Sequence, residues 1–188
     1  YNTWAMGPSR SESGNAMLIA NPHLPWFDMF TWFEAHTISH DLNAYGAGLV
    51  GMPFLGIAFN DYMGWSHTNN VHDGQDLYEL TLKGDGYQWG EEVLQFEERS
   101  VEIKVRDGEG NTSASEFLIR ESVHGPVVSE KDGKAYALRV VGLDQPHVFR
   151  QYFDMARAKT LKSFQNAIRK LQNPFFTIMY ADKDRHIM

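Results

Sequence analysis

Alternation of hydrophobic and polar positions dominates the middle of the chain. From position 77 to position 141, short segments such as LYELTL, VEIKVRD and AYALRVV are separated by the turn sequences KGDG, DGEGN and KDGK. Successive side chains of a strand point to opposite faces, so this pattern predicts antiparallel strands with one exposed face. We therefore expect a strand-rich meander at about residues 77–141.

One amphipathic helix is predicted at residues 160–171, with the sequence TLKSFQNAIRKL. Thr160 is a suitable N-cap, and the Asn173-Pro174 pair would end the helix. The apolar stripe of this helix would consist of Leu161, Phe164, Ile168 and Leu171. Because most other segments are strand-like, the fold class is α+β and mostly antiparallel β.

The two ends of the chain both predict hairpins. Apolar segments at 3–6 and 16–20 flank the polar sequence SRSESGN, and their pairing would bring His23 back towards residue 1. The final sequence FFTIMYADKDRHIM predicts a strand, a turn and the start of a return strand. We therefore expect the chain to be part of a larger domain.

Three segments precede the meander. Residues 28–36 are aromatic on both strand faces, which predicts a strand that is buried on both faces or lines an apolar pocket. Residues 42–56 contain four glycines and a proline, which favours close backbone approach or a loop. Strands at 57–60 and 63–65 would flank a turn, and the polar WSHTNNVHDGQD that follows predicts a loop at a strand end, where sites are commonly built.

Composition excludes several classes of function. The 188 residues are 43% hydrophobic and 13% aromatic, which predicts a globular protein with a core. A net charge of −7, without a Lys/Arg run longer than two, predicts neither a nucleic-acid nor a membrane partner. The lack of cysteine excludes disulfides and a thiol nucleophile, and no apolar run approaches the roughly 18 residues that span a bilayer.

Several spaced motifs occur together in one order. They are Asn2-x-Trp4, NPHLPW at 21–26, GMPFLGIAFNDYMGWSHTNN at 51–70, HGPVVS at 124–129, VVGLDQP at 140–146 and FFTIMYADKD at 175–184. In this order they resemble the penicillin amidase family of N-terminal nucleophile hydrolases, nearest to the cephalosporin acylases and acyl-homoserine lactone acylases. The resemblance implies an αββα layered sandwich, of which residues 1–188 would form the N-terminal portion of the β subunit.

The resemblance also implies a reaction, the hydrolysis of a linear amide in a small N-acyl compound. In this family autoproteolysis of a precursor frees a β chain whose first residue is the nucleophile. A hydroxyl needs an adjacent base, and the α-amino group, with a pKa of about 8, is suited to that role. Residue 1 would attack the acyl carbonyl, and water would then hydrolyse the acyl-enzyme ester. The catalytic residues implied for this chain are Tyr1, Asn2, His23 and Asn69.

Tyr1 departs from the family pattern, which has serine before Asn-x-Trp. A phenol oxygen lies several bonds farther from the α-amino group, and its reference pKa is about 10. Three explanations stay open: an error at this position, a deliberate inactivating substitution, or a natural pseudoenzyme that keeps the fold. A pseudoenzyme would bind acyl amides or serve as an assembly subunit. A generic antiparallel β protein would explain residues 77–141 but not the linked motifs.

The other implied roles concern orientation and the oxyanion. His23 matches the histidine thought to orient the nucleophile and its activating groups. Asn69 takes the position whose backbone N–H donates to the oxyanion, an interaction of roughly 3 kcal/mol. A second donor would lie beyond Met188, on the rest of the β chain, and an α subunit from the same precursor would complete the protein. The family further implies a periplasmic or secreted location.

Gly56 bears on acyl specificity. Cephalosporin acylases hold a glutaryl carboxylate with an arginine at this position, and here no side chain could pair with it. The resemblance therefore implies a preference for uncharged apolar acyl groups, either aliphatic or aromatic. The implied substrate-binding residues are Leu24, Phe30, Trp32, Leu49, Gly56 and Phe176.

Asp73 and Asp76 raise the question of a metal ion. They fall where the penicillin G acylases place calcium ligands, and carboxylate oxygens suit such a hard cation. An acidic turn of this kind is also common without metal, and the cephalosporin acylases do not depend on one. We expect no required cofactor, and structural calcium stays open.

Overall fold

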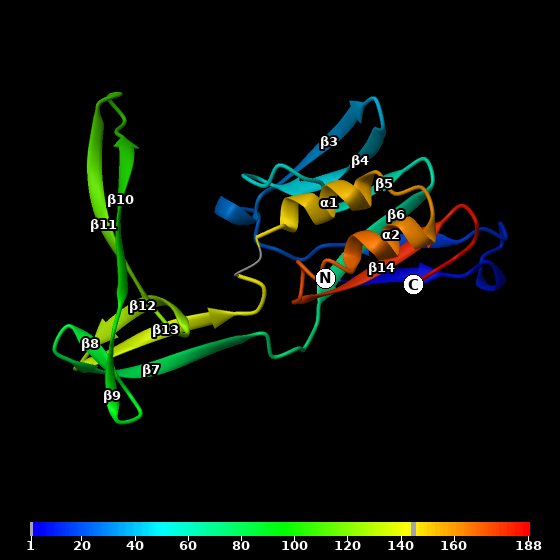
Figure 1. The fold of residues 1–188 in the computed structure, drawn as a ribbon. Helices are drawn as coiled ribbons and strands as arrows, with labels where there is room; N and C mark the ends of the chain where they lie inside the picture. The colour runs from blue at the N-terminus through cyan, green and yellow to red at the C-terminus, as the bar shows by residue number, and fades with distance from the viewer. Residues whose placement is uncertain (1, 144–145) are drawn as a thin grey trace. The chain divides into compact units, whose positions relative to one another are not determined.

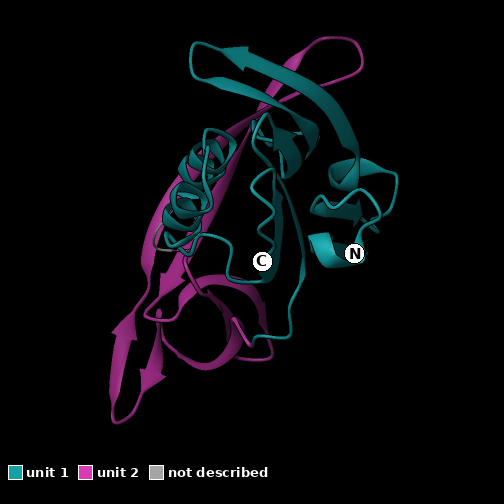
Figure 2. Ribbon diagram, turned by 90° about the vertical axis from the view of Figure 1, so that its right-hand side faces the viewer, with its two compact units in different colours: residues 1–72, 144–188 teal, residues 73–143 magenta. Residues whose placement is uncertain are grey.

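The computed structural model describes residues 2–143 and 146–188. Tyr1 and part of the VVGLDQP motif lie outside the described residues. The chain forms two compact units, unit 1 from residues 1–72 and 144–188 and unit 2 from residues 73–143 (Figure 2). None of the described helices is long and apolar enough to span a membrane.

Unit 1 consists of a hairpin, a five-stranded antiparallel sheet and two α-helices among its described residues (Figure 1). The hairpin strands are β1 (Asn2–Met6) and β2 (Met17–Asn21). The sheet strands, in spatial order, are β14 (Phe176–Asp182), β6 (Met63–Asn69), β5 (Ile57–Asn60), β4 (Leu42–Leu49) and β3 (Trp32–Ser39). The helices are α1 (Val148–Ala156) and α2 (Leu161–Ile168), with short 3-10 helices η1 (Pro8–Arg10) and η2 (Asp28–Phe30).

Two neighbouring residues of β6 show the order of the layers in unit 1. Trp65 is fully buried and lies 6.1 Å, between ring centroids, from Phe164 of α2. A Cβ at the adjacent Gly64 would lie 3.3 Å from Leu18 of β2. Because successive strand residues point to opposite faces, the helices cover one face of the sheet and the hairpin covers the other. Unit 1 thus stacks a helical layer, the sheet and the hairpin.

The N-terminal hairpin has the pairing that the sequence predicted. Asn2 pairs with Asn21 and Met6 with Met17 in an antiparallel register. The strand and turn predicted for the last residues are confirmed, and the returning segment forms an isolated antiparallel bridge between Ala181 and Ile187. The backbone N–H of Met188 donates to the Tyr180 carbonyl at 3.1 Å.

The interval predicted as a helix contains α2, which is shorter than residues 160–171 because it ends at Ile168. Thr160 and Ser163 form a reciprocal capping box, in which Thr160 Oγ1 accepts from the Ser163 N–H at 3.1 Å. The place of Leu171 in the apolar stripe is wrong, since this residue follows the helix with a φ of 53° and is 75% exposed. Helix α1 was not predicted, although its Tyr152 and Met155 are buried.

Two predictions about strands need correction. Residues 28–36 are not a strand buried on both faces, because η2 occupies their first part and β3 is an edge strand of the sheet. The alternative of a pocket-lining strand holds, since Phe33 and Ala35 line an apolar cavity of about 620 Å³ under α1. The polar WSHTNN segment is not a loop, because β6 continues to Asn69 by pairing with β14.

The glycine-rich residues 42–56 combine a strand and a loop. In β4 a Cβ at Gly46 would lie 2.3 Å from the Ile57 carbonyl oxygen, and one at Gly48 would lie 2.4 Å from that of Phe54. The predicted close backbone approach is therefore confirmed. Residues 50–56 form the connection to β5.

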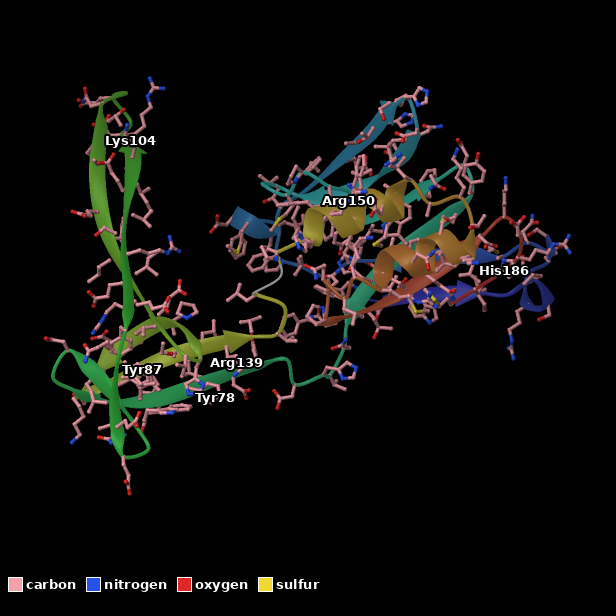
Figure 3. The ribbon with its side chains drawn as sticks, in the orientation of Figure 1. Tyr78, Tyr87, Lys104, Arg139, Arg150 and His186 are labelled. Atoms are coloured by element: carbon pink, nitrogen blue, oxygen red, sulfur yellow. The ribbon has the colours of Figure 1, made fainter. Side chains whose placement is uncertain are left out.

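Unit 2 contains the interval predicted as a meander. Its seven strands lie in the order β10 (Glu97–Arg106), β11 (Thr112–Ser122), β12 (Gly125–Lys131), β13 (Lys134–Val140), β7 (Gln75–Lys83), β8 (Gly86–Trp89) and β9 (Glu92–Gln95). The order departs from a simple meander because β13 returns to pair with β7. Tyr87, labelled in Figure 3, is fully buried in the small core of this unit, which also includes Leu80, Phe96, Ala135 and Ala137.

Candidate active site

The sheet of unit 1 gathers several of the predicted site residues at one of its ends. Adjacent strands are antiparallel, so β3, β5 and β14 begin at the end where β4 and β6 finish. Trp32 pairs with Leu49 there, and Asn69 pairs with Phe176. In Figure 1 the start of β1 lies towards this same end. Residues far apart in the sequence thus converge at the strand ends.

His67 is the buried polar centre of this region. The side chain is 8% exposed, and its ring lies edge-to-face with that of Phe176, with centroids 4.6 Å apart. A Cβ placed on Gly56 would lie 3.3 Å from His67 Cε1 and 4.0 Å from Trp32 Cζ3. The imidazole therefore borders the space where a side chain at position 56 would begin.

The surroundings of His67 favour its neutral form. Burial lowers its pKa from the ordinary value of 6.5, and a hydrogen bond with the Gly56 backbone opposes this effect to a smaller extent. The imidazole is therefore mainly neutral at pH 7. It supplies a polar but uncharged wall.

The Asn69 backbone N–H points away from β14. The neighbouring Asn70 N–H donates to the Phe175 carbonyl at 2.9 Å, and successive N–H groups of a strand alternate between its two edges. The Asn69 N–H therefore faces the edge of β6 that lies towards β5. Along that edge, only Gly64 and Trp65 of β6 pair with β5. This direction leaves the group outside the β5–β6 pairing, at the site end of the sheet.

The segment after β6 is held by its own hydrogen bonds. The Asn70 side chain donates from Nδ2 to the Pro174 carbonyl at 3.0 Å and accepts from the His72 N–H at 3.1 Å. These contacts connect the end of β6 to the residues before β14. They fix the backbone on which the Asn69 N–H is carried.

The remaining predicted residues are less closely assembled. His23 is exposed in the irregular segment after β2, two positions beyond Asn21, and no hydrogen bond joins it to another described residue. Leu24 is half-buried, and Phe30 lies in η2 and is 36% exposed. Tyr1, the predicted nucleophile position, lies outside the described residues.

Asp73 and Asp76 do not form a metal site by themselves. Asp76 lies in β7 opposite Arg139, a residue labelled in Figure 3. Across residues 2–143 and 146–188, no three His, Cys, Asp or Glu side chains are grouped so that they could hold a metal ion. Calcium takes six or more oxygen ligands, so these two carboxylates do not fit the ion without further donors.

Sequence reasoning did not select His67 as a site residue. A signal was present in the alternation of β6, where Met63, Trp65 and His67 share one face and all are buried. A histidine in such a buried series is unusual enough to be a candidate. The contact with Gly56 depends on pairing across the sheet and could not be found in the local sequence.

Comparison with known proteins identifies the family of the chain. The family model described as Penicillin amidase matches residues 2–188. The chain belongs to the penicillin amidase family. Among curated proteins, the acyl-homoserine lactone acylase PvdQ of Pseudomonas syringae pv. syringae is 32% identical over 96% of this chain and 25% of its own length. The acyl-homoserine lactone acylase QuiP of Pseudomonas aeruginosa is 28% identical over 99% of this chain and 24% of its own length.

The fold of this penicillin amidase family member also matches a solved structure. The thermostable penicillin G acylase from Alcaligenes faecalis superposes with a TM-score of 0.81, at 23% identity, over 98% of this chain and 34% of that protein. The chain therefore has the N-terminal nucleophile hydrolase fold, in its mostly antiparallel form. It spans about a quarter of the length of the curated relatives that it matches.

Proposed function

We propose that the protein containing this chain hydrolyses the linear amide bond of N-acyl compounds of the penicillin, cephalosporin or acyl-homoserine lactone type. Its membership of an acylase family and its relatives, which are named acyl-homoserine lactone acylases, support this proposal. The observation that carries it is the convergence of Trp32, Leu49, Gly56, Asn69 and Phe176 at one end of the sheet. Such a site joins an apolar surface to a backbone donor, as acyl transfer requires.

In this proposal residue 1 attacks the acyl carbonyl, and its proton passes to the α-amino group. The negative charge that develops on the carbonyl oxygen is stabilised by the Asn69 N–H, whose direction away from β14 supports the assignment. Release of the amine leaves an acyl-enzyme ester, and water then frees the acid. His23 orients the nucleophile, and Asn2 positions the strand that carries residue 1.

The acyl group is proposed to be uncharged. Gly56 offers no cation, and His67 beside it is held mainly neutral at pH 7. A glutaryl carboxylate would find no bidentate partner at this point, whereas an alkyl or aryl chain would contact Trp32 and Phe176. The proposed partners are an α subunit of the same precursor and the rest of the β chain, in a periplasmic or secreted protein.

A second proposal applies if tyrosine is the native residue at position 1. A phenol ring there would replace the small hydroxyl nucleophile, and the protein would then bind N-acyl compounds without cleaving them. Tyr1 in the sequence is the specific observation that favours this alternative. The two proposals share the acyl-binding region and differ only at the nucleophile.

The first experiment is mass spectrometry of the N-terminal peptide ending at Arg10, together with the intact mass of the chain that carries it. Serine at position 1 would direct the work to hydrolysis of octanoyl, phenylacetyl and glutaryl amides by the complete protein. Tyrosine would require the Tyr1→Ser variant, which should gain amide hydrolysis. If neither a serine protein nor the Tyr1→Ser variant cleaves any of the amides, the hydrolase proposal is wrong.

A structural calcium ion at Asp73 and Asp76 is a separate proposal. Isothermal titration of the purified protein with CaCl₂, before and after Asp73→Asn, tests it directly. A heat signal that the substitution removes would support calcium at this turn. An unchanged or absent signal would reject Asp73 as a ligand.

A further inference from the structure

His67 and Gly56 form a complementary pair at the site end of the sheet. Gly56 lies immediately before β5, and His67 lies inside the adjacent strand β6. A Cβ at position 56 would approach His67 Cε1 to 3.3 Å, closer than most Cβ contacts allow. The other nearby atoms, the Ala47 carbonyl oxygen and Trp32 Cζ3, would lie at 3.9 and 4.0 Å, which are ordinary contact distances. Of these three atoms, only the imidazole carbon lies closer to that Cβ than an ordinary contact distance.

The imidazole is fixed in this place by contacts on several sides. Its ring packs edge-to-face against Phe176, and the Tyr152 ring of α1 lies 6.5 Å away at an interplanar angle of 67°. A hydrogen bond with the Gly56 backbone adds a directional restraint. A side chain held this way cannot swing aside without losing aromatic contacts and a hydrogen bond.

We propose that His67 is a specificity-determining residue for the acyl group, because its ring fills the volume that a side chain at position 56 would take and forms the end wall of the acyl-binding region. This inference rests on the proposed acyl-binding function. Phe176 and Trp32, two of the residues implied for acyl binding, contact or adjoin the same space. The wall would set the longest acyl chain that fits. It would also present no cation to a terminal carboxylate.

The structure offers a way to test the wall from both sides. His67→Ala removes the ring and opens space, whereas Gly56→Ala adds one methyl group that points at it. Gly56 has no positive φ, so its backbone accepts alanine. If the ring is the wall, Gly56→Ala should reduce the affinity for long acyl chains strongly when His67 is present. The same substitution should have little effect on that affinity in the His67→Ala background.

Binding of straight-chain fatty acids gives a readout that does not need an active nucleophile. The complete protein would be titrated with hexanoic, octanoic, decanoic, dodecanoic and glutaric acids by calorimetry. Wild type should bind more tightly with chain length up to a limit and then lose affinity. His67→Ala should move this limit to longer acids, and each further methylene buried there should tighten binding about four-fold, equivalent to ~0.8 kcal/mol.

Controls separate this inference from the proposed function. His40→Ala, at an exposed turn between β3 and β4, should leave the length profile unchanged. His67→Phe keeps a ring at the wall and should retain the wild-type limit. If His67→Ala fails to fold, Gly56→Ala tests the wall alone and should weaken the longest acid that wild type binds.

Three results would count against different claims. An identical length profile in wild type, His67→Ala and Gly56→Ala would overturn the role of His67 while leaving acyl binding intact. Failure of wild type to bind any of the acids would remove the acyl-binding function itself. Tight binding of glutaric acid by wild type would also contradict an uncharged wall.

Discussion

Asn60 connects the turn between β5 and β6 to the end of α1, and its replacement by aspartate tests this connection. Its Nδ2 donates to the carbonyl oxygens of Ala156 and Ala158 at 3.0 and 2.8 Å. Its Oδ1 accepts from the N–H groups of Tyr62 and Met63 at 2.9 and 3.0 Å. All four hydrogen bonds come from one half-buried amide, which uses its full capacity.

The Asn60→Asp substitution preserves size and removes only the two donors. Each lost hydrogen bond contributes about 1 kcal/mol, and the new carboxylate oxygen would face two carbonyl oxygens at hydrogen-bond distance. The last carbonyls of a helix also have no partner within the helix, so they lose their cap. We expect the free energy of unfolding to fall by about 2–4 kcal/mol at pH 7.

Urea unfolding followed by circular dichroism measures this change, with the denaturant slope compared between variants. Asn166→Asp is the matched control, because Asn166 is exposed on α2 and its Oδ1, which aspartate retains, accepts from Arg169. Its effect should stay within about 0.5 kcal/mol. Lowering the pH towards 4 should narrow the deficit of Asn60→Asp, since a protonated carboxyl donates again. Equal stabilities for the two variants at pH 7 would refute the reasoning.

Three further substitutions test other parts of unit 1. Asp182→Asn should lower the free energy of unfolding by about 1.5–3 kcal/mol, because the buried carboxylate accepts from the Tyr180 hydroxyl at 2.7 Å; an unchanged thermal midpoint would contradict this. Thr160→Ala should cost about 1 kcal/mol in urea unfolding by removing the cap on the Ser163 N–H, and a loss below about 0.3 kcal/mol would show that the capping box contributes little. His67→Phe should flatten the pH dependence of stability between pH 7 and 5. The folded state has the lower pKa, so in wild type the unfolded chain binds more protons below pH 6.5 and stability falls as the pH drops through the folded-state pKa. Equal slopes in urea midpoints for wild type and His67→Phe would argue against a buried neutral histidine.

Asp182 also illustrates how a turn is built from one buried carboxylate. Its Oδ1 accepts from the His186 N–H at 2.8 Å, and its Oδ2 lies 2.9 Å from His186 Nδ1 (Figure 3 labels His186). Burial alone would raise the pKa of Asp182, but the hydrogen bonds from Tyr180 and His186 outweigh it and lower the pKa. Burial, together with the same carboxylate, raises the pKa of the Tyr180 hydroxyl, which stays protonated. The Asp182 carboxylate is therefore ionised at neutral pH, and its hydrogen bonds hold the turn after β14.

Much of the local structure could be predicted because its signals lie close together in the chain. The hairpin of β1 and β2 follows from two apolar segments around a polar turn. The start of α2 follows from Thr160 and its spacing to the first apolar turn, while its end was placed too late because Leu171 continues the helical spacing without being helical. Helix α1 escaped prediction because its amphipathic segment is short and its burial depends on contacts with the sheet.

The order of the motifs, the antiparallel class and the family resemblance were present in the sequence by itself. Tertiary structure alone decided that His67 faces Gly56, that the Asn69 N–H turns away from β14, and that no third His, Cys, Asp or Glu side chain joins Asp73 and Asp76 among the described residues. The physical reason is that strand and helix periodicities express interactions between residues a few positions apart. The site instead depends on register between distant strands, and register is selected by the packing of the whole sheet.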